Sequence, residues 1–155
     1  MKSRNIHVEI YDLNLPGAVR MLKIFISYNA ADRSFARKLT TDLRNYGHNV
    51  WIDESEINIG DPIIEKIREA LDKIDYVIVI LSKASINSEW VKKEIDIAFA
   101  REIEEKRVMI LPIIIEHHIK LPGFLKGKRY GDFSREDNYE EKLELLLRSL
   151  KNSYN

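Results

Sequence analysis

Residues 76–82 read Tyr-Val-Ile-Val-Ile-Leu-Ser, an unbroken apolar run that ends on a serine. The apolar side chains do not alternate with polar ones, which is typical of a strand covered by helices on both faces of a parallel sheet. Residues 108–115, Val-Met-Ile-Leu-Pro-Ile-Ile-Ile, form a second run of this kind. Both runs are far shorter than the ~20 residues that cross a bilayer. They therefore predict two central strands of a buried sheet.

Strand-like and helix-like segments alternate on either side of these runs. Further strands are expected at residues 22–28, 49–52 and 129–133, where β-branched or aromatic side chains gather. Helices are expected at residues 32–46, about 61–74, about 88–105 and in the C-terminal segment that carries Leu143, Leu146, Leu147 and Leu150. Five strands that alternate with these helices predict a doubly wound α/β fold with right-handed crossovers.

The first expected helix has apolar side chains three to four residues apart, namely Phe35, Leu39, Leu43 and Tyr46. This spacing predicts an amphipathic helix. Gly47 follows directly, and glycine is the usual residue just past the end of a helix. We therefore expect the helix to stop there.

Composition and charge narrow the function classes. The chain has 155 residues, of which 45% are apolar and 32% charged, as in a single globular domain. Lys plus Arg and Asp plus Glu each number 25, so no general attraction to nucleic acid or an anionic membrane is expected. There is no cysteine, which excludes a disulfide framework and a thiol nucleophile and fits a reducing compartment.

Residues 1–20 fall outside the strand-helix alternation. Ile6, Val8 and Ile10 alternate with more polar neighbours, so this segment is either an extra edge strand or a loosely attached leader. The domain proper is expected at residues 21–155. The N-terminus lacks the apolar stretch of a secretory signal, so we expect a cytoplasmic protein.

Several familiar sites are absent from the sequence. The six glycines form neither a Gly-x-Gly-x-x-Gly fingerprint nor a Walker lysine loop. A phospho-accepting receiver domain needs an aspartate at the end of its third strand, where Ser82 stands. The histidines lack the spacing of metal ligands and are expected to be solvated: His7, His48, His117 and His118. We expect neither a metal nor a resident cofactor.

Ligands of an open α/β sheet bind beyond the carboxyl ends of its strands. Polar residues follow three of the predicted strands at these ends: Ser27 with Tyr28, the loop 53–61, and Ser82. The helix expected next carries Trp90 and Glu94, which are four residues apart and therefore share one face. A carboxylate beside an indole at a cleft would have a raised pKa if buried, which makes Glu94 a candidate site residue.

In this order and spacing, the segments resemble a Toll/interleukin-1 receptor (TIR) domain across residues 22 to about 150. The resemblance is carried by Phe25-Ile26-Ser27-Tyr28, by Val50-Trp51-Ile52-Asp53 with the loop containing Gly60, by Val77-Ile78-Val79-Ile80-Leu81-Ser82, and by Ser88-Glu89-Trp90-Val91-Lys92-Lys93-Glu94-Ile95. It implies a flavodoxin-like three-layer sandwich: a five-stranded parallel sheet in the order 2-1-3-4-5 with helices on both faces. The last strand lacks the Phe-Trp pair of animal receptors, which favours the microbial type.

Enzymatic members of this family cleave the bond between nicotinamide and ribose in NAD+. The resemblance therefore implies an NAD+ glycohydrolase, for which NAD+ is the substrate and no cofactor is needed. Glu94 matches the position of the catalytic glutamate. The positions that match segments around the nucleotide are Ser27, Tyr28, Gly60, Ser82 and Trp90.

The resemblance also implies partners. TIR domains bind one another through the loop after the second strand, here residues 53–61, and head-to-tail assembly often completes the active site. The expected partners are NAD+, other TIR domains in a homo-oligomer or filament, and a separate sensor or effector protein. The implied setting is microbial, antiviral defence signalling, without a nucleic acid or membrane partner.

The chemistry asks little of the protein. Nicotinamide departs without needing a proton, and an ionised Glu94 would stabilise the oxocarbenium-like transition state. Attack by water would give ADP-ribose, and attack from within the nucleotide would give a cyclic product. Two other functions stay open at this point: a non-enzymatic TIR adaptor, and a nucleoside N-glycosidase or deoxyribosyltransferase.

Overall fold

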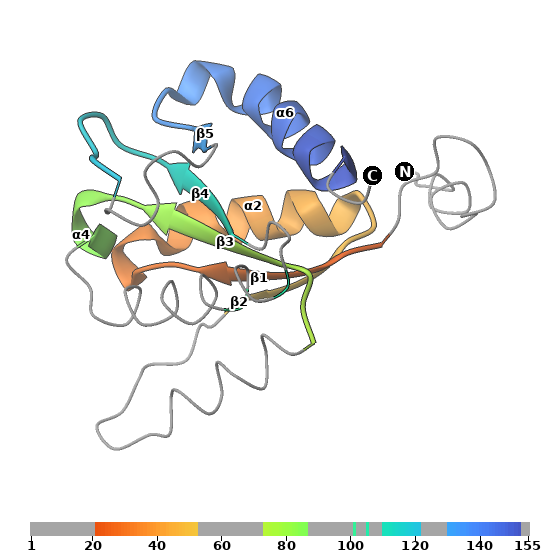
Figure 1. The fold of residues 1–155 in the computed structure, drawn as a ribbon. Helices are drawn as coiled ribbons and strands as arrows, with labels where there is room; N and C mark the ends of the chain where they lie inside the picture. The colour runs from red at the N-terminus through yellow and green to blue at the C-terminus, as the bar shows by residue number, and fades with distance from the viewer. Residues whose placement is uncertain are drawn as a thin grey trace.

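The computed structural model describes residues 21–52, 73–86, 101, 105, 110–121 and 130–152. Within these residues the strands form one five-stranded sheet, in which all neighbouring pairs are parallel (Figure 1). The strands are β1 (Lys23–Ser27), β2 (Asn49–Ile52), β3 (Tyr76–Leu81), β4 (Ile110–Ile114) and β5 (Gly131–Asp132). The sheet order is β2-β1-β3-β4-β5, so the predicted order 2-1-3-4-5 is confirmed.

The two apolar runs occupy the interior of the sheet, as predicted. All six residues of β3 are buried, and this strand pairs with β1 on one side and with β4 on the other. The register places Ile26 opposite Ile78 and Ile80 opposite Ile113. A strand with neighbours on both edges and no polar face is stable only inside the protein, which explains the absence of alternation in its sequence.

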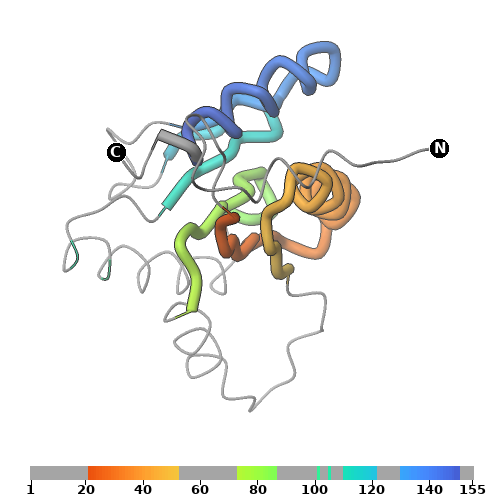
Figure 2. Tube along the Cα trace, turned by 90° about the vertical axis from the view of Figure 1, so that its right-hand side faces the viewer, coloured from red at the N-terminus to blue at the C-terminus, as the bar shows by residue number. Residues whose placement is uncertain are grey.

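Helices α2 (Arg33–Asn45) and α6 (Tyr139–Asn152) cover the same face of the sheet (Figure 2). Shorter helical turns are η1 (Ala30–Asp32), α4 (Lys83–Ile86) and η3 (Glu136–Asn138). The core between α2, α6 and the sheet is built largely from Ile24, Ile26, Leu39, Leu43, Ile78, Ile80, Ile113, Leu143, Leu146 and Leu150. Among the described residues, no helix has the length and apolar character required to cross a bilayer.

Some expected segments lie outside the described residues. These are residues 1–20, the loop 53–61, most of the helix at about 61–74 and most of the helix at about 88–105. Of the last, Arg101 and Glu105 are described, are helical and form an ion pair at 3.1 Å.

Helix α2 agrees with its predicted bounds but not with the whole of its predicted apolar stripe. Leu39 and Leu43 are buried, whereas Tyr46 is 50% exposed. Tyr46 is the C-cap, with φ −90° and ψ 7°, so the backbone has left the helix at this residue. Its side chain therefore does not extend the buried face of Leu39 and Leu43. Gly47 has φ 94° and donates its amide to the Arg44 carbonyl, which is the predicted glycine stop.

An aromatic cluster joins α2, the end of β5 and α6. The rings of Phe35, Phe133 and Tyr139 meet edge to face, with centroids 5.6–6.1 Å apart. The Tyr139 hydroxyl donates to Asp42 Oδ2 at 2.5 Å, and Lys38 Nζ lies 3.9 Å from the Tyr139 ring centroid. Burial and the Asp42 carboxylate hold the pKa of Tyr139 well above its usual range. The cluster therefore fixes α6 against α2.

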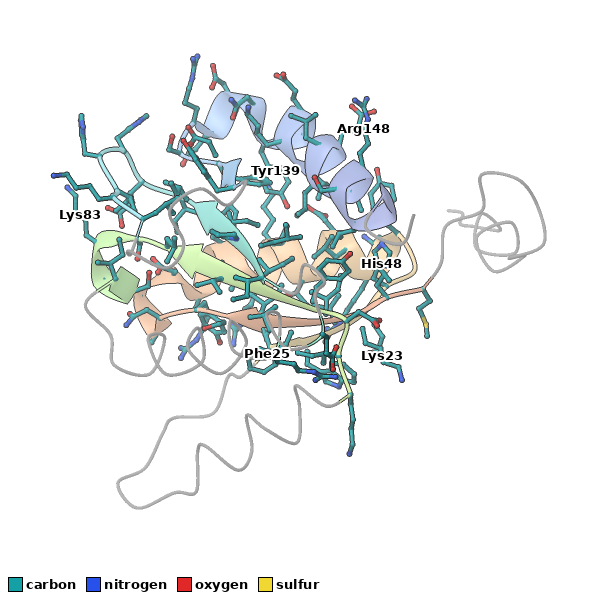
Figure 3. All side chains as sticks on the ribbon, viewed as in Figure 1. Lys23, Phe25, His48, Lys83, Tyr139 and Arg148 are labelled. Atoms are coloured by element: carbon teal, nitrogen blue, oxygen red, sulfur yellow. The ribbon has the colours of Figure 1, made fainter. Side chains whose placement is uncertain are left out.

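The expectation that His48 is solvated is wrong, because its side chain is buried. It lies at the amino end of the sheet, at the opposite end from Lys83 (Figure 3). Its Nδ1 accepts a hydrogen bond of 3.2 Å from the backbone amide of Leu22. Burial lowers the pKa of His48, so the neutral ring is the folded form.

We expect the domain to lose stability as the pH falls below about 6.5, because the unfolded chain then binds a proton that the buried, neutral ring of His48 resists. Protonation removes the acceptor for the Leu22 amide, so the loss is on the order of 1 kcal/mol. Urea unfolding at pH 7.5 and pH 5.5 measures it.

The variant His48→Asn keeps an acceptor oxygen but cannot titrate, so its stability should change less over this pH range than that of the wild type. His118→Asn is the matched control, because His118 is exposed and its φ of 63° suits asparagine. Equal pH dependence in the wild type and His48→Asn would contradict the assignment.

Candidate functional site

The carboxyl ends of the parallel strands meet at one edge of the sheet, near α4 (Figure 1). Lys83, at the start of α4, marks this edge in Figure 3. The polar residues at these strand ends are Ser27, which is the last residue of β1, Tyr28 directly after it, Ser82 after β3 and Glu116 after β4. This edge is the position at which ligands of open α/β sheets bind.

Ser27 and Tyr28 end β1 as buried residues. Neither the Ser27 Oγ nor the Tyr28 hydroxyl oxygen has a hydrogen-bond partner among the described residues. Buried polar atoms are nearly always paired in proteins, because an unpaired one retains the cost of leaving water. The end of β1 therefore holds two hydroxyls with unused hydrogen-bonding capacity.

Ser82 follows β3 and begins α4 through a reciprocal pair of hydrogen bonds with Ser85. The Ser85 amide donates to Ser82 Oγ at 3.1 Å, and the Ser82 amide donates to Ser85 Oγ at 2.8 Å. This is the pattern of a capping box, with serine in place of the usual glutamate or glutamine three residues on. Ser82 is 0% exposed. Its side chain is thus built into the start of α4.

The hydroxyl hydrogen of Ser82 goes to Asp32, 50 residues earlier in the chain. Ser82 Oγ donates to Asp32 Oδ2 at 2.6 Å, a length typical of a hydrogen bond to an ionised carboxylate. Asp32 is only 8% exposed. Burial raises the pKa of Asp32, the Ser82 hydrogen bond opposes that rise, and the nearby charge of Glu116 adds to it. The site therefore contains a buried carboxylate held by a single described side-chain donor.

Local backbone structure places Asp32 at this point. The turn η1 begins at Asn29, whose side chain accepts from the Ala31 amide at 3.0 Å. Asp32 then stands at the N-cap of α2, yet its carboxylate makes no capping hydrogen bond. An N-cap aspartate ordinarily stabilises its helix by about 1 kcal/mol. Here the carboxylate is directed across the sheet edge to Ser82 instead.

A second carboxylate reaches the same edge from the segment after β4. Glu116 Oε1 accepts from the Lys83 backbone amide at 3.2 Å. The backbone amide of Ser82 is thus bound by Ser85, and that of Lys83 by Glu116. The start of α4 is therefore connected by side chains to the segments after β1 and after β4.

The structure brings three of the predicted site residues, Ser27, Tyr28 and Ser82, to the same edge of the sheet. Glu94, Trp90 and Gly60 lie outside the described residues, so their roles stay predictions. Sequence reasoning missed Asp32, Ser85 and Glu116. The spacing Ser82-x-x-Ser85 before an apolar segment is the one local signal that could have indicated the capping pair.

A cavity of about 280 Å³ lies elsewhere, beside β4, β5 and α6. Its lining includes Pro112, Tyr130 and Lys142, and none of Ser27, Tyr28 or Ser82. Among the residues that the structure describes, no three His, Asp or Glu side chains gather closely enough to hold a metal ion. That the site works without a metal remains a prediction.

Comparison with known proteins identifies the family to which this fold and this sheet edge belong. The TIR domain family model matches residues 24–147. The 2' cyclic ADP-D-ribose synthase BtTIR of Bacteroides thetaiotaomicron is 37% identical over 101 residues, which are 64% of this chain and 35% of that protein. The NAD(+) hydrolase TcpA of a Theionarchaea archaeon is 40% identical over 91 residues, 58% of this chain and 27% of that protein. The chain thus spans about a third of the length of these curated relatives.

Solved structures agree with the fold. The TIR domain of the Toll-related receptor TRR-2 from Hydra magnipapillata superposes with a TM-score of 0.67 at 22% identity, over 83% of this chain and 98% of that domain. A prokaryotic SEFIR domain superposes with a TM-score of 0.59 at 18% identity, over 84% of this chain and 99% of that one. The family match over residues 24–147, on a five-stranded parallel sheet of this order, shows that the chain belongs to the TIR domain family.

Proposed function

We propose that this TIR domain cleaves the bond between nicotinamide and ribose in NAD+, giving ADP-ribose or a cyclic ADP-ribose. The observation that carries the proposal is its likeness to relatives named as an NAD(+) hydrolase and a 2' cyclic ADP-D-ribose synthase, at 37–40% identity. The two unpaired hydroxyls at the end of β1 support it, because a ribose or phosphate offers them hydrogen-bonding partners.

The reaction needs charge stabilisation more than acid catalysis. Nicotinamide leaves as a neutral molecule, and positive charge develops on the ribose as the bond breaks. We assign Glu94 the role of stabilising that charge as an ionised carboxylate. Trp90 supplies a face for stacking against a ring of the nucleotide, which also excludes water. Ser27 and Tyr28 contact the nucleotide from the end of β1, and Gly60 lies in the loop that borders it.

Self-assembly belongs to the same proposal. Residues 53–61 would bind a second TIR domain, and a separate sensor or effector protein would trigger the association. Such head-to-tail contacts extend into filaments rather than closing. We propose microbial defence signalling in the cytoplasm as the setting. Structures of assembled TIR domains, such as those of the activated Roq1 resistosome, are among the similar solved structures.

The test of the proposed function uses the purified chain at low and high concentration, with NAD+ and, separately, with nucleosides. Base release is followed by chromatography, and association by light scattering. Release of nicotinamide, rising more steeply than in proportion to protein concentration, is the expected result. Association without turnover would instead indicate the adaptor, and base release from nucleosides alone would indicate the nucleoside hydrolase or transferase.

A further inference from the structure

We infer that Asp32 is a positioning residue, which holds the segment after β1 against the start of α4 through the hydroxyl of Ser82. The inference rests on the proposed function, since the two segments that it joins carry the polar residues of the candidate NAD+ site. Asp32 itself needs no contact with the nucleotide. Its effect on catalysis passes through Ser82.

The first argument is the direction of the Asp32 side chain. Its backbone stands at the N-cap of α2, where a carboxylate ordinarily accepts hydrogen bonds from the first turn. The carboxylate forgoes that local partner and accepts from Ser82 Oγ at 2.6 Å instead. A residue that breaks a local rule in favour of a long-range contact is more typical of a functional site than of ordinary folding.

The second argument is that the contact is costly to keep. Asp32 is nearly inaccessible to water, and burial together with the charge of Glu116 raises its pKa. An alanine at this position would carry no desolvation penalty. A charged group retained under these conditions therefore needs a benefit other than burial.

The third argument is the geometry of the start of α4. The Ser82 hydroxyl donates to Asp32 and accepts from the Ser85 amide, so one oxygen connects the segment after β1 to the first turn of α4. Glu116 binds the neighbouring Lys83 amide from the other side. The Asp32 hydrogen bond sets the rotation of the Ser82 hydroxyl, leaving its lone pairs toward Ser85. Without Asp32, that hydroxyl is free to turn, and the start of α4 loses this side-chain hydrogen bond to the segment after β1.

This arrangement gives Ser82 a role in holding the site together rather than in contacting the nucleotide. The serine is fully buried, and its hydroxyl both donates a hydrogen bond, to Asp32, and accepts one, from the Ser85 amide. Ser82 thus contributes to the site by holding α4, whereas the unpaired hydroxyls of Ser27 and Tyr28 face no described partner. Ser27 and Tyr28 lie only a few residues before Asp32, on the segment that the Asp32–Ser82 bond restrains.

The experiment compares Asp32→Ala, Asp32→Asn and Ser82→Ala with the wild type. We expect Asp32→Ala to lower kcat for NAD+ cleavage by about 10–100-fold, the scale on which misplaced site groups slow a reaction, with a smaller change in KM. Asp32→Asn keeps an acceptor oxygen for the Ser82 hydroxyl and should return kcat to within about threefold of the wild type. Because Ser82→Ala removes the hydrogen bond to Asp32 and also the acceptor of the Ser85 amide, it should lose at least as much as Asp32→Ala, and the double variant should lose no more than Ser82→Ala.

A second readout does not depend on turnover. Hydrogen exchange of the amides at residues 82–86 should accelerate in Asp32→Ala, whereas exchange in α6 should not change. Asp137→Ala is the matched control, since its carboxylate is exposed and pairs with exposed Arg135. All activities are measured below the unfolding transition of each variant. If Asp32→Ala does not fold, Ser82→Ala removes the same hydrogen bond from the other side.

The outcomes separate this inference from the proposed function. If the wild type cleaves NAD+ and Asp32→Ala keeps its kcat, the positioning role is overturned while the proposed function stands. If the wild type does not cleave NAD+, the proposed function fails, and accelerated exchange at residues 82–86 in Asp32→Ala still supports the coupling. Unchanged exchange there overturns it. A loss of thermal stability with unchanged kcat assigns Asp32 a merely structural role and also overturns the inference.

Discussion

Replacement of Glu94 by glutamine is expected to reduce NAD+ cleavage on the order of 10²–10³-fold, with the loss in kcat rather than in KM. Glutamine preserves the size and most of the hydrogen-bonding shape of glutamate but carries no negative charge. The charge is needed only as the pyridine leaves and the ribose becomes positive, so its removal raises the transition state more than the bound substrate. Nicotinamide release under saturating NAD+ measures the effect.

The control for this variant is Glu141→Gln in the first turn of α6, where the glutamate is exposed and is not one of the predicted site residues. It makes the same chemical change and should leave kcat as in the wild type. Glu94→Ala should lose at least as much as Glu94→Gln. Turnover by Glu94→Gln within about threefold of the wild type would exclude a charge-stabilising role for this residue, since lost electrostatic stabilisation of a transition state costs far more.

The largest expected change in stability follows from Leu39→Ala in α2. Leu39 is 0% exposed and packs in the core between α2 and the sheet. Truncating a fully buried leucine removes its burial energy and leaves a cavity, at a cost of about 2–5 kcal/mol. That is a large fraction of the net stability of a domain, which is about 5–15 kcal/mol. The midpoint of thermal unfolding should fall by about 5–15 °C, as calorimetry can measure.

Leu145→Ala is matched to this variant, because it makes the same change within a helix but at a side chain that is 43% exposed. It should cost well under half as much, since much of the Leu145 side chain is already in contact with water and the truncation removes less buried apolar surface. Equal losses at Leu39 and Leu145 would mean that helix propensity, rather than core packing, determines the effect. Both variants should keep the same kcat below their unfolding temperatures.

The sequence by itself predicted most of the fold, because the relevant information is local. The unbroken apolar runs at residues 76–82 and 108–115 indicated strands buried on both faces, and both are interior strands. The spacing of Leu39 and Leu43 with a following glycine indicated α2 and its end. Tyr46 was the exception, since a periodicity cannot tell the last helical residue from the cap that follows it.

The candidate site was predictable only in part. Strand ends at Ser27, Tyr28 and Ser82 follow from the strand pattern, because parallel strands end at one edge of the sheet. The roles of Glu94, Trp90 and Gly60 depend on the resemblance to TIR domains and stay predictions. The environment of His48 was predicted wrongly, because its burial depends on the start of β1, 26 residues away in the chain.

Within the described residues, the sequence alone therefore determined the succession of the five strands and of helices α2 and α6 along the chain, since hydrophobic periodicity and turn residues act over a few neighbouring positions. Only the tertiary structure decided that the Asp32 carboxylate turns from its own helix to the hydroxyl of Ser82, and that Glu116 binds the amide of Lys83. These contacts join residues 50 and 33 positions apart. Their existence depends on how the parallel strands align, which no local pattern encodes.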